Sequence, residues 1–519
     1  MSSKFSIEIS DTARARANKL NFEELVRELC CPNYFDHTDR DQYVACGSVF
    51  FHPAAKETHR EMIDRYNELC ESPPLVATDL EEGPGAMIKG ATEFPSYYGC
   101  SRKGPERLGY EMGRIAALEG REVGYNWTFA PCVDILSNPD TPTTSYRSAG
   151  EELERVVAMG KAYSKGCQDF GMIATAKHFP GDGFGVYDQH LTTPEIPLTL
   201  DAWRESSGRS FKEVIDGGVM SVMPGHLSFP AYDEPDDRGI YPPATLSSKL
   251  MGDLLRGELG FDGLIVSDAV GMGGFCGYRN YYDACAVFWE CGGDVLLFAH
   301  PDDVFISEME KRIQNGLLKT ETMVERATRL ISLKEQIGLL GGSETPFTKG
   351  SGPIDLERHQ SVANEVIESS VEIVRDRQGI LPIANVSSKK ALHVVLPVES
   401  YQDLSLMKAF TSKLQERFEA VDEMVDPGNH AIWNALDEYD VIVCSLANNY
   451  NFGTNAIRFH GPVARNLMKG WMHMGTPAVF VSHYHPLTHL EYEAVMDTVI
   501  RTCGTIEGSL DPLVRRIVG

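Results

Sequence analysis

The sequence predicts a mixed α/β protein in which a (β/α)8 barrel of the TIM type precedes a smaller α/β sandwich with a mostly parallel sheet. Three observations predict this fold. Apolar, strand-like runs alternate with helix-like stretches about seven or eight times in the first two thirds of the chain. Polar residues stand at the C-terminal ends of these runs. A segment rich in Gly, Ser, Thr and Pro then separates a second, shorter α/β pattern.

The strand-like runs of the first part are short, apolar and rich in β-branched residues. They lie at 43–51, 75–79, 126–130, 173–177, 219–223, 264–268 and 294–298, and helix-like stretches lie at 105–120, 150–171, 201–217 and 247–260. A doubly wound sheet is the alternative. The barrel is favoured because Asp79, Lys177, His178 and Asp268 end predicted strands, and barrel active sites form at that face.

The predicted domain boundaries follow the composition. Residues 1–340 form the barrel, 341–353 the linker and 354–519 the sandwich domain. In the sandwich, residues 357–376 have a helical pattern, and strands are expected at 391–396, 441–446, 478–482 and 498–503.

The composition excludes several classes of function. The chain has 519 residues, of which 42% are hydrophobic, so it can bury a full core and disorder is excluded as its main state. Its formal net charge of −26 argues against a nucleic-acid binder and against docking on an anionic membrane. A small neutral oligosaccharide or glycoside fits this charge best, and the oligomeric state stays open.

The 12 cysteines are scattered and form no Cys-x-x-Cys pair, which predicts free thiols. An acidic N-terminus without an apolar stretch predicts no signal peptide, so we expect a cytoplasmic protein. We expect no cofactor and no metal. The alternative is a metal site formed by His483, His485 and His489. Without a metal, these residues are expected to form a polar loop after a strand.

Two segments carry candidate chemistry. The first is Lys177-His178-Phe-Pro-Gly-Asp-Gly183, followed by Asp188-Gln-His190. A carboxylate on one imidazole nitrogen fixes the tautomer and raises the basicity of the other, which suits acid–base catalysis. The second is Asp268, which ends the apolar run 264–268, where a barrel enzyme can present a nucleophilic carboxylate. A helix N-cap is the alternative for Asp268.

These segments resemble glycoside hydrolase family 3, and specifically its β-N-acetylglucosaminidase branch. Three further motifs support the resemblance: Asp79-Leu-Glu-Glu-Gly83, the stretch Asn126-Trp-Thr-Phe-Ala-Pro-Cys-Val-Asp134 with Asn138-Pro139, and Arg147-Ser-Ala-Gly150. The resemblance covers residues 15–340, and the linker with the sandwich is similar to two-domain members. No dinucleotide or Walker A fingerprint is present.

The resemblance implies a role for each matching residue. Asp268 would be the nucleophile that forms a covalent glycosyl-enzyme, His190 the general acid/base, and Asp188 the residue that orients it. Residues expected to bind sugar hydroxyls are Asp79, Arg147, Lys177, His178 and, at the end of the next strand, His226. Asp134 would support the loop.

The implied function is that of a retaining, exo-acting β-N-acetylglucosaminidase. Asp182 and Ala149 stand where that branch commonly has His and Phe, and these departures concern the substrate more than the reaction. The alternatives are a β-glucosidase or another exo-glycosidase of the family, a glycoside phosphorylase, and a non-catalytic carbohydrate-binding protein.

Overall fold

The computed structural model describes residues 4–350, 353–397, 403–428, 430–448, 459, 461–467 and 470–519. The chain divides into two compact units. The first contains residues 1–93, 104–144 and 148–359, and the second contains 94–103, 145–147 and 360–519. The two units therefore do not follow the simple serial order of the expected boundaries, because two short segments from the first third of the chain pack with the C-terminal unit.

The first unit is an eight-stranded parallel barrel in the described part of the chain. Seven strands form one sheet in the order β10-β9-β8-β7-β5-β3-β2, β11 pairs with β1, and the bridge between Val266 and Val295 joins β10 to β11. The pieces β1 and β2 flank Pro32 and supply one strand position. The strands are β1 Cys30–Cys31, β2 Asn33–Tyr34, β3 Ser48–Phe51, β5 Leu75–Thr78, β7 Trp127–Thr128, β8 Ile173–Phe179, β9 Ser221–Pro224, β10 Leu264–Ile265 and β11 Leu296–Leu297.

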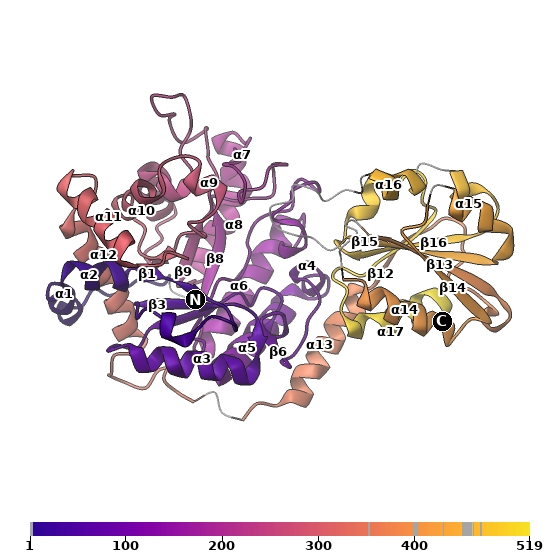
Figure 1. Cartoon of the computed structure of the whole chain (residues 1–519), viewed down its shortest axis with the longest axis horizontal. Coiled ribbons are helices and arrows are strands. Elements are labelled where there is room, and N and C mark those ends of the chain that lie inside the picture. Colours follow the sequence, from indigo (N-terminus) through magenta and orange to yellow (C-terminus); the bar gives the residue numbers. More distant parts are fainter. Residues whose placement is uncertain are drawn as a thin grey trace. The chain divides into compact units, whose positions relative to one another are not determined.

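Helices cover the outside of this barrel (Figure 1). They are α1 Asp11–Ala17, α2 Phe22–Glu28, α3 Lys56–Leu69, α5 Pro105–Val123, α6 Leu153–Asp169, α7 Leu200–Glu205, α8 Ser207–Asp216, α10 Tyr281–Glu290, α11 Asp303–Gln314 and α12 Thr320–Gln336. The short helix α9 Gly273–Cys276 instead contacts the backbone of Gln189 and His190. A π-helix spans Lys249–Glu258, and the short strands β4 Ala54–Ala55 and β6 Ile88–Lys89 pair beside the barrel. All seven residues of β8 are buried, as expected for a parallel strand covered on both faces.

The second unit is a six-stranded sheet with helices on both faces (Figure 1). The order β12-β17-β16-β15-β13-β14 is parallel except for the edge strand β12. Its elements are α4 Tyr97–Cys100, α13 Leu356–Ser370, β12 Glu372–Asp376, β13 Lys390–Pro397, α14 Ser405–Gln415, β14 Ala420–Val425, α15 Ala431–Ala435, β15 Val441–Asn448, α16 Gly461–Leu467, β16 Ala478–Tyr484, β17 Thr498–Arg501 and α17 Leu510–Val518. The barrel and the sandwich confirm the predicted fold class.

The expected helix over 357–376 is wrong at its C-terminal end. Helix α13 ends at Ser370, and β12 follows as an antiparallel edge strand. The segment Glu372–Asp376 is mostly exposed or half-buried, so its polar residues tolerate an edge position.

The early segment 94–103 is an integral part of the second unit. The Ser96 hydroxyl donates to the Cys503 carbonyl oxygen at 2.6 Å. A Cβ on Gly99 would lie 2.6 Å from that same oxygen, so only glycine allows this close approach.

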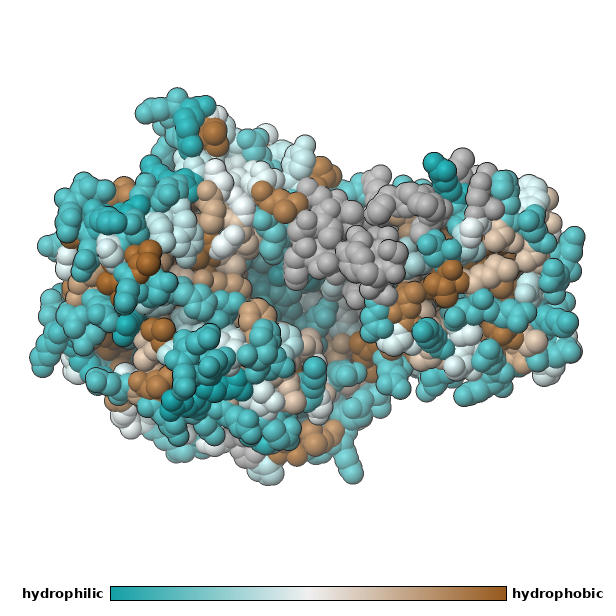
Figure 2. All heavy atoms as spheres, viewed as in Figure 1, coloured by the Kyte–Doolittle hydropathy of each residue, from teal (hydrophilic) through white to brown (hydrophobic). Residues whose placement is uncertain are grey.

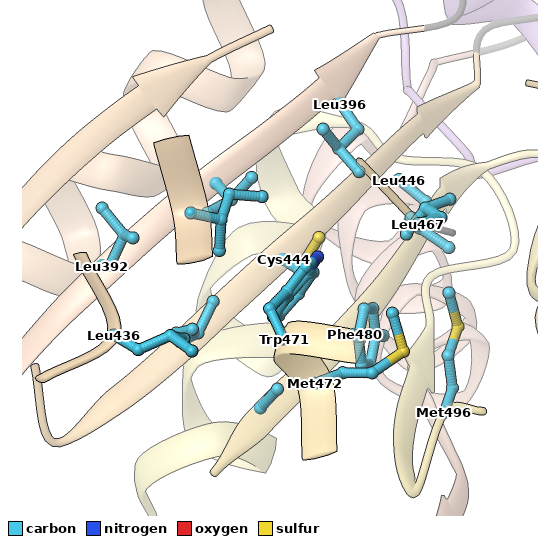
Figure 3. Close-up of a cluster of buried hydrophobic side chains, with 14 of the residues drawn as sticks. Leu392, Leu396, Leu436, Cys444, Leu446, Leu467, Trp471, Met472, Phe480 and Met496 are labelled. Carbon is cyan, nitrogen blue, oxygen red and sulfur yellow. The ribbon is translucent and has the colours of Figure 1, made fainter. Parts of the chain in front are cut away.

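One core cluster of the second unit lies around Trp471 (Figure 3). This side chain is 1% exposed, its indole nitrogen donates to the Asn466 carbonyl at 2.7 Å, and its ring centroid lies 5.7 Å from that of Phe480. Alternate residues of the central strands, including Leu392, Cys444 and Leu446, complete this face of the sheet.

The Trp471→Ala variant is expected to lower the free energy of unfolding of the second unit by about 3–5 kcal/mol, because it leaves a large cavity in a close-packed cluster. Urea denaturation measures the loss. Trp433, which is 41% exposed, supplies the control, since Trp433→Ala removes the same ring from the surface. Equal midpoints for the two variants would contradict the assignment of Trp471 to the core.

Among the described residues, every helix is either too short or too polar to cross a bilayer. The face drawn in Figure 2 is largely hydrophilic, with apolar residues in scattered patches. This distribution is typical of a solvated surface.

Candidate active site

The C-terminal ends of the barrel strands bring most of the predicted residues to one face. Asp79 follows β5 directly, Lys177 and His178 lie within β8, and Asp268 lies three residues after β10. The pairing of β8 with β9 shifts register between Lys177 and Phe179. Such irregularities redirect side chains near active sites, and here both Lys177 and His178 make contacts with other predicted site residues.

Asp268 is held as a carboxylate in a confined position. Its side chain is 14% exposed, and its Oδ1 accepts a hydrogen bond from the Ala269 N–H at 2.7 Å. Burial alone would raise the pKa of Asp268, but its neighbours hold this pKa below the ordinary aspartate value. Those neighbours are the imidazoles of His178, His226 and His190 and the N–H of Ala269. An ionised, partly shielded carboxylate is the form that a nucleophile requires.

His178 is fixed by a carboxylate behind it. Asp134 is fully buried, and its Oδ2 lies 2.7 Å from His178 Nδ1. Burial opposes ionisation of Asp134, yet contacts with His178 and the backbone N–H of Asp182 keep its pKa below the ordinary value. An ionised carboxylate only accepts hydrogen bonds, so His178 Nδ1 donates and Nε2 faces Asp268, at 4.0 Å from its Oδ2. Asp134 therefore orients His178 and does not itself face a substrate.

The Asp134→Asn variant is expected to be about 2 kcal/mol less stable at neutral pH, because buried hydrogen bonds to a charged acceptor are replaced by bonds to an amide. The folded pKa of Asp134 is lowered, so its ionised form stabilises the fold above an unfolded value of about 3.9. That contribution is lost as the pH falls through the folded pKa.

Urea midpoints at pH 7 and at decreasing pH test this linkage. The difference in urea midpoint between the wild type and Asp134→Asn should become smaller at acidic pH. A difference that stays constant with pH would contradict the role of the ionised carboxylate. Asp237 is exposed, so Asp237→Asn is the control for loss of one carboxylate.

Lys177 is buried between two carboxylates. Its side chain is 3% exposed, its Nζ lies 3.0 Å from Asp79 Oδ1, and it also forms an ion pair with Glu81. The Asp79 side chain is 40% exposed, so it is the member of this group that can contact a ligand. Sequence reasoning missed Glu81. Its position two residues beyond Asp79, after the same strand, was the available signal.

His190 has the arrangement expected of an acid/base group. Asp188 is fully buried, and its Oδ1 lies 2.6 Å from His190 Nδ1 and accepts the backbone N–H of His190 at 2.8 Å. The imidazole itself is 28% exposed. The His190 carbonyl accepts the Gly273 N–H at 2.7 Å, which ties this loop to the segment that follows Asp268.

His226 lies inside the protein, and its predicted contact with a sugar stays a prediction. It is fully buried, its Nδ1 lies 2.9 Å from Thr245 Oγ1, and its Nε2 lies 3.0 Å from the Ala269 carbonyl oxygen. Burial lowers the pKa of His226, although Asp268 opposes the shift. Both ring nitrogens thus contact other groups of the protein, one of them the backbone carbonyl of Ala269, next to Asp268.

Gln189, which sequence reasoning also missed, connects two of these loops. It is 1% exposed, and its Oε1 accepts the backbone N–H of His226 at 2.8 Å. A single Gln between two catalytic candidates carries no signal of its own in the sequence.

Arg147 and Asp182 are two further buried polar residues of the predicted segments. Arg147 is 9% exposed on the 3-10 turn Ser145–Arg147, which belongs to the second unit, so its sugar-binding role stays a prediction. Asp182 is buried and accepts a hydrogen bond from Thr143. Burial and the charge of Asp134 raise the pKa of Asp182 to about 6.

Within the described residues, one group has the proximity of metal ligands: Cys132, Asp134 and His178. These atoms already contact one another, since Cys132 Sγ donates to Asp134 Oδ2 at 3.2 Å and His178 Nδ1 contacts the same oxygen. This pairing explains the group without an ion. His483, His485 and His489 do not form such a group, and His483 contacts Ser445 and Thr505 instead.

Comparison with known proteins finds a family and several similar chains. The family described as "Glycosyl hydrolase family 3 N terminal domain" matches residues 45–333. A relative from Cellulomonas fimi, named "Beta-N-acetylglucosaminidase/beta-glucosidase", is 28% identical over 508 residues, which cover 94% of this chain and 88% of that protein.

Two solved structures share the fold over nearly the whole chain. "Beta-glucoside phosphorylase BglX bound to 2FGlc" has a TM-score of 0.89 and 26% identity, and covers 99% of this chain and 95% of its own. The family 3 β-N-acetylglucosaminidase from Paenibacillus sp. str. FPU-7 has a TM-score of 0.79 and 23% identity, with 96% and 97% covered.

Proposed function

Because the chain belongs to glycosyl hydrolase family 3, we propose that it is a retaining, exo-acting β-N-acetylglucosaminidase that removes a non-reducing terminal N-acetylglucosamine. The observation that carries the proposal is Asp268 at the C-terminal face of the barrel, with His178 Nε2 4.0 Å from its Oδ2 and with its pKa held below the ordinary value by His178, His226 and His190. The name of the Cellulomonas fimi relative supports N-acetylglucosamine as the sugar that is removed.

The first chemical step forms a glycosyl-enzyme. Asp268 Oδ2 attacks C1 of the sugar, and the bond from C1 to the glycosidic oxygen breaks as a proton passes from the His190 imidazolium to that oxygen. Asp188 stabilises the imidazolium and orients it through Nδ1. The aglycone then leaves as an alcohol, and His190 is neutral.

The second step reverses these roles. Neutral His190 removes a proton from water, the water oxygen attacks C1, and the bond to Asp268 breaks. Two inversions at C1 retain the β configuration. Asp79, Lys177 and His178 would hold the sugar hydroxyls, so that C1 stays aligned with the carboxylate.

A phosphorylase is the second candidate, and the likeness to the β-glucoside phosphorylase favours it. In that reaction phosphate replaces water in the second step, and a neutral imidazole repels it less than a carboxylate would. The test is a panel of p-nitrophenyl β-glycosides, comparing the N-acetylglucosaminide with the glucoside and xyloside, each with and without phosphate.

The proposal requires release of free N-acetylglucosamine that does not depend on phosphate. A sugar phosphate as product would establish phosphorolysis, and preference for the glucoside would establish a β-glucosidase. Sugar binding without any turnover would establish a carbohydrate-binding protein.

We further propose that the protein works in the cytoplasm on a neutral glycoside. All 12 cysteines are free thiols in the structure, which supports a reducing compartment. The net charge of −26 disfavours anionic substrates, although salt screens charges over about 8 Å.

A further inference from the structure

The loop that carries His190 exposes three apolar side chains. Val186 is 47% exposed, Tyr187 60% and Leu191 50%. Single exposed apolar residues are ordinary on a protein surface, but grouped ones mark binding sites. We propose that Val186, Tyr187 and Leu191 form an aglycone subsite, which binds an apolar face of the leaving group. This inference rests on the acid/base role proposed for His190.

The position of the loop follows from the chemistry of His190. A general acid must come within about 2.6–3.2 Å of the oxygen that it protonates. The aglycone is bonded directly to that oxygen, so its first atoms lie beside the imidazole. We therefore expect the exposed residues that flank His190 in this loop to contact the leaving group.

Burial along the loop alternates in pairs. Val186 and Tyr187 are exposed, Asp188 and Gln189 are buried, and His190 is half-buried beside the exposed Leu191. The buried pair uses its polar groups to hold the loop, since Asp188 contacts His190 and Gln189 contacts the His226 backbone. The apolar side chains are therefore the part of this loop that stays exposed.

The loop is fixed by further contacts. The Asp188 carbonyl accepts N–H groups from Leu191 and Thr192 at 3.0 and 3.1 Å. Thr193 Oγ1 donates to the Gly274 carbonyl oxygen at 2.9 Å. A fixed loop loses little conformational entropy on binding, so its apolar contacts add to affinity.

The chemistry of the loop limits what it can bind. Residues 184–193 contain no Lys or Arg, and their one carboxylate, Asp188, is buried. Apart from the His190 imidazole, an anionic aglycone would find no cationic side chain on this loop. An aromatic ring or alkyl chain would pack on Tyr187, and so would the C–H face of a second sugar ring.

Two aglycones of similar leaving-group acidity test the subsite: 2-phenylethyl and 2-methoxyethyl β-N-acetylglucosaminides. We expect the Tyr187→Ala variant to lose about fivefold or more in kcat/KM on the phenylethyl glycoside and less than twofold on the methoxyethyl glycoside. The disaccharide of two β-1,4-linked N-acetylglucosamines forms a third arm. A similar loss there identifies a sugar face as the occupant, and no loss there identifies an aryl or alkyl group.

Two controls make the result specific. Ile9 is 42% exposed and precedes α1, before the first barrel strand, so Ile9→Ala should leave all three substrates unchanged. With 2,4-dinitrophenyl glycosides, kcat limited by the second step should also stay unchanged in Tyr187→Ala, because the aglycone has already left.

Equal losses on both alkyl glycosides, or no loss on either, would overturn the subsite. If the enzyme turns over glucosides in place of N-acetylglucosaminides, the same aglycones are attached to glucose. The ratio of kcat/KM between the two aglycones then still reports the contribution of the loop. A wrong sugar and a wrong subsite therefore give different results.

Discussion

Replacing Asp268 by alanine is expected to lower kcat/KM by about 10⁴-fold or more on every substrate, including activated aryl glycosides. In the proposed mechanism this carboxylate bonds to C1, and the structure places His178 Nε2 4.0 Å from its Oδ2. The matched variant Asp268→Asn keeps the shape of the side chain and removes its charge. It should be as inactive as Asp268→Ala if the covalent bond to oxygen is what matters.

The covalent intermediate gives a direct measurement. A 2-fluoro glycosyl inhibitor should label the wild type at the peptide that contains Asp268 and should not label Asp268→Ala. Azide should partly restore turnover of an activated glycoside in Asp268→Ala, with an α-glycosyl azide as product, because the anion enters from the vacated face. Labelling at another carboxylate would displace Asp268 as the nucleophile.

Replacing His190 by alanine is expected to affect substrates according to their leaving groups. Glycosides of alkyl alcohols should lose about 10²–10⁴-fold in kcat/KM, since their leaving oxygen needs a proton in the first step. Dinitrophenyl glycosides leave without that help, and their first step should change less than tenfold. Pre-steady-state release of the phenol measures the first step separately from the second.

Asp188→Asn is the matched control for this prediction. It keeps the imidazole but weakens the electrostatic support of the protonated form, because the Oδ1 contact with His190 Nδ1 loses its charge. Its losses should follow the same order of leaving groups as His190→Ala, with smaller factors. Equal losses on all leaving groups would exclude His190 as the acid.

Much of the fold could be predicted because the barrel strands are buried on both faces. Strands such as β5 and β8 therefore appear as continuous apolar runs that end in polar residues. The first strand position was missed, since β1 and β2 are two-residue pieces separated by Pro32. Edge strand β12 was missed for a different reason: its mixed polar sequence continues the helical pattern of α13.

The candidate site was predictable where function requires a charged residue at a strand end, as for Asp268 and Lys177. Residues that act through others left no comparable signal. Glu81 and Gln189 matter because of their contacts with residues that are distant in sequence. Glu81 pairs with Lys177, and Gln189 accepts the backbone N–H of His226. His226 was predicted from its place after a strand, and the sequence did not indicate that both its ring nitrogens contact Thr245 and the Ala269 carbonyl oxygen.

The hydrogen bond between Ser96 and Cys503 has a consequence for synthesis of the chain. These residues are 407 positions apart, so at roughly 5–20 residues per second the ribosome makes the acceptor about 20–80 s after the donor. During that interval, segment 94–103 cannot form its contacts with the C-terminal part of the second unit. Translation speed is therefore expected to influence the yield of folded protein.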